Sequence, residues 1–401
     1  MTNTPAQLAL WSLVATFAIQ IYTALVATAT AVLAPAIAHD LAITPKWIGV
    51  FVGLVYAGAG VASLMCGTFI HRRGAIRVSQ AGVLICAAGI GAIAAVPAHA
   101  VAVAGGAALV IGAGYGVITP ASSHVLARTT PAHRMGLVFS IKQTGVPAGA
   151  ALGGAVLPLL ALSLGWRAAF AALAIVGVGV ALCAQPIRGS LDDDRQPSSR
   201  FTLAAVAEPL RIVFRSRPML RLSMMAFTYS AVQLSLTSFI VVYLAESLHW
   251  SLVGAGFVLT AATTAGVVGR IAWGAWADRS GEPRKVLQLI GVIASVCALT
   301  LAFSNAQWWA LPILLVVAVF GATAVGWNGV MLAEVARLAP SGKAGAITGA
   351  TGFVSLFGVV AGPPAFAALA GSAGGYPAAF GLLTILSLTG AVLVARDGAR
   401  T

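Results

Sequence analysis

The sequence has few charged residues, and this scarcity excludes most classes of protein. Only 8% of its 401 residues are charged, whereas a soluble domain normally carries about 25%. So few charges cannot cover the surface of a soluble body of this length. A disordered chain is also excluded, because disorder requires low hydrophobicity and 59% of this sequence is hydrophobic. The composition therefore indicates a polytopic integral membrane protein.

The sequence also lacks the patterns that build metal sites, disulfide frameworks and catalytic centres. Its four cysteines show no CxxC or Cys/His spacing, and they fall in or near apolar runs, where small buried side chains are expected. No metal cluster, nucleophile–base pair or soluble signalling domain can be recognised. We therefore expect no metal, no cofactor and no enzymatic activity.

What the sequence does contain is a series of long apolar runs. Continuous runs of this length are typical of membrane-spanning helices, whereas a membrane barrel would show short alternating segments. The chain up to Gln7 holds no Lys or Arg, which favours a retained first helix over a cleaved signal peptide. Twelve spans are predicted, at roughly 9–36, 47–70, 76–96, 100–126, 136–164, 167–185, 219–245, 251–277, 286–304, 308–336, 343–370 and 374–394.

Positive charges are distributed unevenly over the loops between these spans. With both termini placed in the cytoplasm, nineteen of the 23 Lys and Arg residues lie on the cytoplasmic side, two lie outside, and Lys142 and Arg270 fall inside spans. This asymmetry predicts a multi-pass protein of a bacterial-type inner membrane, embedded in the lipid bilayer with both termini cytoplasmic. The basic residues are scattered over short loops, so no nucleic-acid partner is expected.

A polar stretch from Gln185 to Pro218 divides the chain into two sets of six spans. It contains the acidic run Asp192–Asp194, and it is predicted to be a linker with a surface helix at about 200–215. The predicted organisation is therefore an N-terminal six-helix bundle over residues 1–185, a cytoplasmic linker over 186–218 and a C-terminal six-helix bundle over 219–401.

The two halves of the chain share sequence patterns about 207 to 210 residues apart. Because each half has an even number of spans, both copies keep the same membrane orientation, which is a parallel repeat. The matching segments are Gly67–Arg77 with Gly274–Arg284, Val125–Arg128 with Glu334–Arg337, and Gly165–Phe170 with Gly375–Phe380.

The pattern G-x-x-x-D-R-x-G-x-x-R between spans 8 and 9, with its copy between spans 2 and 3, resembles the signature loop of the major facilitator superfamily. The resemblance covers the whole chain. It implies an all-α integral membrane fold of twelve transmembrane helices in two six-helix bundles, with a substrate site near the midplane that opens alternately to each side. A monomer is expected.

In that family, the acid of the signature loop helps to latch the bundles in the outward-facing state. The second loop has Asp278 at this position, whereas the first has His71, which either alters the latch or is a solvated loop residue. The residues predicted to take part in conformational gating are the loop residues His71, Arg72, Asp278 and Arg279 and the helix-breaking Gly145, Pro147, Gly362 and Pro363.

Ionisable side chains inside the spans are the strongest candidates for a binding site, because they are costly in hydrocarbon. Of the ten acids only Glu334 falls in a span, near its inner end, so the deep charges are Lys142 in span 5 and Arg270 in span 8. By the resemblance, these spans pack against each other, which would allow an anion to lie between the two cations. Each cation also has an alternative role. Lys142 could extend its ammonium to the lipid headgroups, and Arg270 could donate hydrogen bonds to backbone carbonyls of the spans.

The resemblance also implies that spans 1, 4, 7 and 10 line the cavity. Their polar residues, together with the neighbour of Lys142, complete the predicted substrate site: Gln20, Tyr22, Tyr115, Gln143, Tyr229, Gln233, Trp327 and Asn328. His124 and Glu334 are the candidates for proton coupling.

These residues favour a secondary active transporter that moves a small organic anion, expected to be a carboxylate, by proton-coupled symport or by exchange. The alternative is a proton-coupled efflux antiporter for drugs or other small molecules. Family members that export cations usually carry a membrane-embedded acid in the first half and an Arg in span 4, and this chain has neither. The electrostatics therefore favour an anionic substrate.

Overall fold

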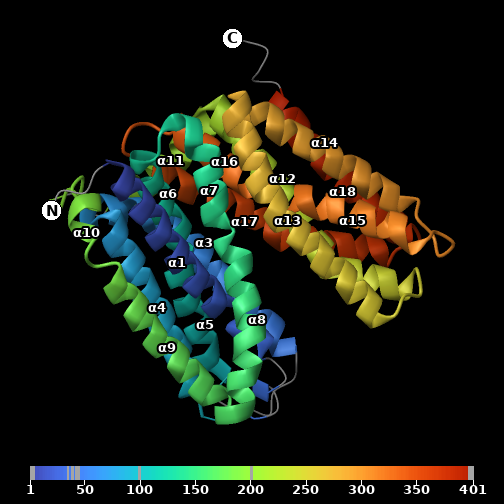
Figure 1. The fold of residues 1–401 in the computed structure, drawn as a ribbon, viewed down its shortest axis with the longest axis horizontal. Coiled ribbons are helices and arrows are strands. Elements are labelled where there is room, and N and C mark those ends of the chain that lie inside the picture. The colour runs from blue at the N-terminus through green and yellow to red at the C-terminus, as the bar shows by residue number, and fades with distance from the viewer. Residues whose placement is uncertain are drawn as a thin grey trace. The chain divides into compact units, whose positions relative to one another are not determined.

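The computed structural model describes residues 5–33, 36–37, 40, 46–97, 101–198 and 202–395, and within these residues every regular element is a helix (Figure 1). In this described part of the chain, twelve helical spans are long and apolar enough to cross a membrane. Each overlaps one of the twelve ranges predicted from the sequence, so the predicted all-α membrane fold is confirmed.

The chain forms two compact units that do not coincide with its two sequence halves. Unit 1 comprises Met1–Thr130, Lys142–Arg211 and Ala339–Phe353, and unit 2 comprises Pro131–Ile141, Ile212–Leu338 and Val354–Thr401. Each unit thus contains a short segment from the other half of the sequence. The two exchanged segments lie about 209 residues apart, which is the offset of the internal repeat.

The helices of unit 1 share an apolar core that includes Cys66, Ile111 and Phe170. They are α1 (Pro5–Val32), α3 (Lys46–Arg73), α4 (Ala75–Ala94), α5 (Val101–Gly116), α6 (Ile118–Thr129), α8 (Gly145–Leu164), α9 (Trp166–Cys183) and α10 (Arg188–Leu191).

Unit 2 has its own apolar core, built around Phe320, Phe366 and Phe380. Its helices are η1 (Ala132–Arg134), α12 (Arg217–Glu246), α13 (Leu252–Ser280), α14 (Pro283–Ala302), α15 (Ala310–Ala324), α16 (Asn328–Leu338) and α18 (Gly375–Ala395). Three helices have residues in both units: α7 (Met135–Gln143), α11 (Leu203–Arg215) and α17 (Ala344–Ala370).

Three of the spans are interrupted within the residues that the structure describes, and the sequence explains two of these interruptions directly. Pro120 has no amide hydrogen for the carbonyl of Gly116, where α5 ends, and Pro147 has none for the carbonyl of Gln143, where α7 ends. The third break separates α15 from α16 over residues 325–327, a stretch that contains Gly326 and is followed by Gly329. By contrast, Pro363 and Pro364 lie within the unbroken α17.

Close helix contact in unit 1 depends on glycine. Gly112 and Gly116 of α5 lie against the backbone of α3 at Val55 and Ala59, where a Cβ atom would find no space. Small residues allow helix backbones to approach in this way in membranes, where dispersion contacts replace the hydrophobic effect as the packing force. The high glycine content of the sequence therefore supports helix packing.

Most of the linker belongs to unit 1, and its last residues belong to unit 2. The predicted surface helix is confirmed as α11, although its apolar face packs inward, with Pro209 and Val213 buried. The acidic run before it was predicted to be ordinary linker. Instead, Asp192 is only 3% exposed and accepts hydrogen bonds from the amides of Ile76 (2.8 Å) and Arg77 (3.0 Å), so it caps the first turn of α4.

Candidate functional site

Lys142 is the centre of a polar cluster in unit 1. Its side chain is 1% exposed, and its Nζ donates to Gln20 Oε1 of α1 at 2.6 Å and to Gln143 Oε1 at 3.0 Å, with Thr119 Oγ1 of α6 at 3.5 Å. The cluster forms where the broken spans α5–α6 and α7–α8 bring polar side chains together. Lys142 is therefore held inside the unit by neutral oxygens, and it does not snorkel to the headgroups.

Thr119 is the member of this cluster that the sequence did not single out. It precedes Pro120 at the α5–α6 break, and residue 119 corresponds to Asn328 at the repeat offset of 209. A polar residue next to a helix-breaking proline in span 4 is the signal that could have found it. The buried Gln20 also retains one side-chain atom, Nε2, without a hydrogen-bond partner in the described residues.

Arg270 of α13 is the buried cation of unit 2, as Lys142 is in unit 1. It lies beside the break between α15 and α16. It is 3% exposed, and its Nε and Nη2 both donate to the carbonyl of Val325, at 3.2 and 2.7 Å. Val325 is the C-cap residue that follows α15, where carbonyls lack helical partners and the helix dipole favours a cation. The structural role that the sequence left open for Arg270, bonding a span carbonyl, is thus present.

Three predicted residues of unit 2 are joined by hydrogen bonds next to this break. Gln233 Oε1 of α12 accepts from Trp327 Nε1 at 3.2 Å and from Asn328 Nδ2 at 3.1 Å. The Tyr229 ring packs edge-on against Trp327, with centroids 5.7 Å apart. The structure therefore brings these four predicted residues together. One of them, Trp327, is two residues after Val325, whose carbonyl accepts from Arg270.

The tyrosine hydroxyls serve the packing of each unit. Tyr22 donates to the carbonyl of Leu173 at 3.2 Å, and Tyr229 donates to the carbonyl of Leu287 at 2.9 Å. Tyr115 packs against the core of unit 1. These contacts tie spans to one another, so Tyr22 and Tyr115 take part in helix–helix packing.

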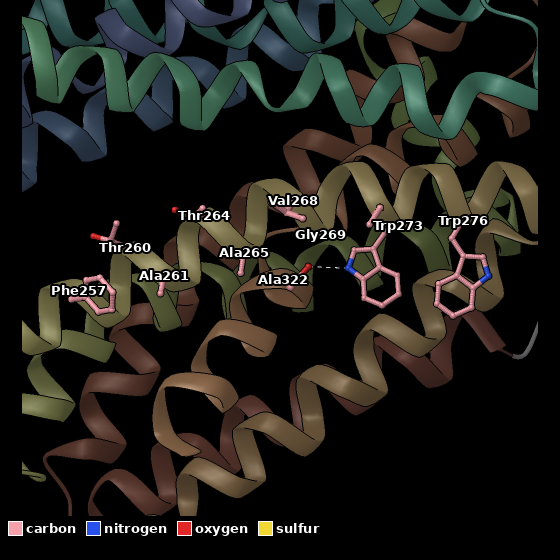
Figure 2. Close-up of a pocket in the computed structure, with 11 residues that line it drawn as sticks. Phe257, Thr260, Ala261, Thr264, Ala265, Val268, Gly269, Trp273, Trp276 and Ala322 are labelled. Carbon is pink, nitrogen blue, oxygen red and sulfur yellow. Dashed lines mark hydrogen bonds between the residues drawn. The ribbon is translucent and has the colours of Figure 1, made fainter. Parts of the chain in front are cut away.

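An apolar cavity of about 820 Å³ runs along α13 in unit 2 (Figure 2). Figure 2 shows its lining along one side of the helix from Phe257 to Trp276, with Ala322 contributed by α15. The rings of Trp273 and Trp276 are stacked at 5.6 Å, and Trp273 Nε1 donates to the Ala322 carbonyl at 2.9 Å. Sequence reasoning missed this cavity, because its residues are ordinary for a membrane helix.

Asp278 is the centre of an ion-pair network in unit 2. We call the end of the spans that carries His71 in unit 1 and Asp278 in unit 2 the signature-loop end. In unit 2, Asp278 accepts hydrogen bonds from the amides of Gly136 (2.8 Å) and Leu137 (2.7 Å), in the first turn of α7. Arg337 pairs with the same carboxylate at 3.1 Å. Asp278 therefore joins an exchanged segment, a signature loop and span 10 within one unit.

Glu334, a predicted proton carrier, belongs to this network. Its carboxylate lies 2.7 Å from Arg284 Nε and 3.9 Å from Arg337. The other predicted carrier, His124 in unit 1, is 4% exposed, and its Nε2 lies 2.6 Å from Asp194 of the linker. The two residues thus lie in separate ion-pair networks at the signature-loop end.

The signature-loop end of unit 1 takes its acids from the linker. Arg128 pairs with Asp193 at 2.6 Å and with Asp194 at 2.9 Å. Hydrogen bonding to Arg128 lowers the pKa of Asp193, whereas burial raises the pKa of Asp192. His71 itself is exposed and lines a cavity of about 460 Å³, together with His124, Asp194, Glu208 and Lys343.

The described acidic side chains have partners away from Lys142 and Arg270. Besides the pairs above, Asp40 pairs with Arg167, Glu208 with Lys343, Glu246 with Tyr376 and Glu282 with Lys285. The tenth acid, Asp397, lies outside the described residues. Among the described residues, each unit therefore buries one cation within a membrane span, Lys142 in unit 1 and Arg270 in unit 2.

Comparison with known proteins agrees with this architecture. The Major Facilitator Superfamily matches residues 16–363 of the chain. An uncharacterised MFS-type transporter of Mycobacterium tuberculosis strain CDC 1551 is 27% identical over 278 residues, and a second one, from strain H37Rv, is equally similar. The alignment covers 68% of this chain and spans about 60% of the length of each of these relatives.

Several solved transporters share the fold. The Escherichia coli fucose:proton symporter is 16% identical with a TM-score of 0.74, and covers 97% of this chain and 98% of its own. A bacterial homologue of the iron transporter ferroportin, solved in an outward-facing state, is 15% identical with a TM-score of 0.74 and full coverage of both chains. A human organic anion transporter is 16% identical with a TM-score of 0.75, covering 98% of this chain and 100% of its own.

At these identities the solved structures establish the fold. The sequence match over most of the chain, the twelve spans and the repeated signature loop together establish the family. The chain belongs to the major facilitator superfamily of membrane transporters.

Proposed function

We propose that the protein is a secondary active transporter of a small organic anion, most simply a carboxylate, which it moves by alternating access. The proposal is supported by one observation above all: each unit buries a cation inside a membrane-spanning helix, Lys142 in unit 1 and Arg270 in unit 2. A buried cation is costly in hydrocarbon. An anionic substrate offsets that cost, whereas a cationic substrate adds to it.

The chemistry of the two clusters fits a carboxylate. A guanidinium can hold a carboxylate through two hydrogen bonds, and an ammonium supplies a compact charge. The neutral donors and acceptors nearby, Gln20, Gln143 and Asn328, are suited to orienting polar groups without adding charge. In this proposal Arg270 keeps its hydrogen bonds to the Val325 carbonyl. It therefore also stabilises the break between α15 and α16, because that carbonyl lies in the break.

The charge distribution supports a bacterial-type inner membrane, with the signature-loop end in the cytoplasm. In this proposal the driving force is a proton gradient or a counter-substrate. His124 and Glu334, with their ion-pair partners, are the proton-carrying candidates for the symport mode. Counterflow that needs no pH gradient would assign the exchange mode.

The test is uptake of radiolabelled carboxylates and inorganic anions into proteoliposomes, with and without a pH gradient. Lys142→Ala and Arg270→Ala should each lower anion uptake by about 10- to 100-fold, the cost of losing a charge-assisted hydrogen bond. Arg270→Lys should keep part of the activity, because it keeps the charge. Lys285→Ala, which removes an exposed cation of unit 2, is the matched control and should leave uptake unchanged.

The thermal unfolding midpoint of each variant separates a loss of function from a loss of folding. Uptake that persists in both alanine variants would overturn the anion assignment. Movement of a lipophilic cation such as tetraphenylphosphonium, driven by a pH gradient and surviving both substitutions, would instead identify the alternative, a proton-coupled efflux antiporter.

A further inference from the structure

The segment that joins the linker to span 7 is unusually basic. Four arginines fall between Arg211 and Arg221, and the chain has no acid between Glu208 and Glu246. Glu208, the acid nearest in sequence, is engaged by Lys343 at 2.6 Å. The positive charge of this segment is therefore not neutralised by the acid nearest to it in sequence.

Four side chains of this segment are exposed, and one of them is aromatic. Arg211, Phe214 and Arg215 are exposed on α11, and Arg217 is exposed at the start of α12. The Phe214 ring has 55% of its surface accessible, although the preceding Val213 is fully buried. We call these four residues the linker arginine patch.

The burial of α11 sets the direction in which the patch faces. Pro209 and Val213 point into the protein, while Arg211 and Arg215, one turn apart, share the opposite face. Ser216 then has an extended conformation (φ −90°, ψ 109°), and α12 begins at Arg217 as a membrane span. The patch therefore lies next to the start of a membrane span, where we expect lipid headgroups to meet hydrocarbon.

We propose that the linker arginine patch is a binding site for anionic phospholipid, in which the arginines hold the headgroup phosphate and Phe214 inserts among the acyl chains. Arginine suits this role because its planar guanidinium binds phosphate through two hydrogen bonds. Basic clusters next to a membrane span recognise anionic lipid in this way, and an amphipathic helix with an exposed aromatic ring is suited to the interface. The inference is independent of the transported substrate.

The experiment measures lipid binding to the purified full-length protein in neutral detergent by native mass spectrometry. Phosphatidylglycerol and phosphatidylcholine with the same acyl chains are titrated in parallel. The wild-type protein should bind phosphatidylglycerol about tenfold more tightly than phosphatidylcholine. The triple variant Arg211→Gln, Arg215→Gln, Arg217→Gln should lose most of that preference, and Phe214→Ser should weaken binding of both lipids severalfold.

The matched control removes the same number of charges elsewhere. Arg73, Arg134 and Arg195 are exposed and lie far apart in the sequence, so the triple variant Arg73→Gln, Arg134→Gln, Arg195→Gln should change phosphatidylglycerol binding by less than about twofold. Equal losses in the two triple variants would overturn the proposal, because diffuse charge would then explain the binding. Equal affinity of the wild-type protein for the two lipids would also overturn it.

Two further measurements cover the remaining outcomes. Salt raised from 50 to 500 mM should weaken phosphatidylglycerol binding to the wild-type protein, which supports the proposal without any variant that could fail to fold. Inorganic phosphate at millimolar concentration should compete poorly. If it displaces phosphatidylglycerol completely, the site recognises free phosphate, and the lipid assignment is wrong.

Discussion

At the signature-loop end of unit 2, Asp278 caps the first turn of α7, whereas the repeat-equivalent position in unit 1 is His71. A carboxylate can accept from two amides at once, as Asp278 does from Gly136 and Leu137, and a neutral imidazole has a single acceptor nitrogen. Unit 1 instead receives Asp192, Asp193 and Asp194 from the linker.

This difference shows what the repeat preserves. Both units place carboxylates among basic side chains and helix N-termini at the signature-loop end, where the positive end of the helix dipole favours them. Unit 2 takes its carboxylate from the signature loop itself, and unit 1 takes its carboxylates from a segment more than 100 residues further along the chain. The repeated requirement is therefore electrostatic, while the residues that meet it are free to differ.

The largest effect that would distinguish the units is expected from Asp278→Ala. It removes two amide bonds and the pair with Arg337, so it should destabilise the protein by about 3 kcal/mol. His71→Ala removes an exposed side chain, and its effect should stay within about 0.5 kcal/mol. Thermal unfolding in one detergent compares them directly. Similar shifts for both variants would show that the two positions are equivalent after all.

A smaller effect is expected when unit 1 is made to resemble unit 2. His71→Asp places a carboxylate near the start of α17, where Ala346 and Lys343 line the same cavity. Capping that helix should stabilise its first turn by about 1 kcal/mol. Hydrogen exchange at the amides of residues 344–346 reports the change. Slower exchange is expected, and unchanged exchange would mean that the cavity keeps the carboxylate away from the helix.

The smallest effect concerns the pH dependence of the linker contacts. Arg128 lowers the pKa of Asp193, so the charged form is favoured in the folded state. The contribution of this pair is therefore present above the ordinary Asp range and is lost as the pH falls through the lowered pKa. Asp193 is largely exposed, so we expect no more than about 0.5 kcal/mol. Proteolysis of the linker at pH 7 and at pH 3 should reveal a modest loss of protection in the wild type that Asp193→Asn lacks.

Much of the fold could be predicted because membrane spans are encoded locally. Length and hydropathy placed all twelve spans, and Pro120 and Pro147 explain two of the three breaks by the loss of single amide hydrogens. One contact in the predicted substrate site could also be read from the local sequence, because Gln143 directly follows Lys142 in the chain. The contacts of Lys142 with Gln20 and Thr119 could not, because they depend on which helices pack together.

The linker acids could not be assigned from the sequence. The run Asp192–Asp194 has the composition of a solvated linker, and its partners Ile76 and His124 are distant in the chain. Nothing in the local pattern distinguishes an acid that caps a remote helix from one that faces water. For Lys142, both the buried and the snorkelling positions satisfied the sequence, and only the packing around α1 decides between them.

The exchanged segments have a consequence for how the chain acquires its structure during synthesis. The Ser63 hydroxyl bonds to the carbonyl of Gly349, 286 residues later, and residues 339–353 belong to unit 1. The first unit therefore stays incomplete until residues 339–353 have left the ribosome. Contacts between residues so far apart in the sequence favour slow folding. Until residues 339–353 are inserted, the earlier helices of unit 1 are only partly assembled in the membrane and are accessible to quality-control proteases.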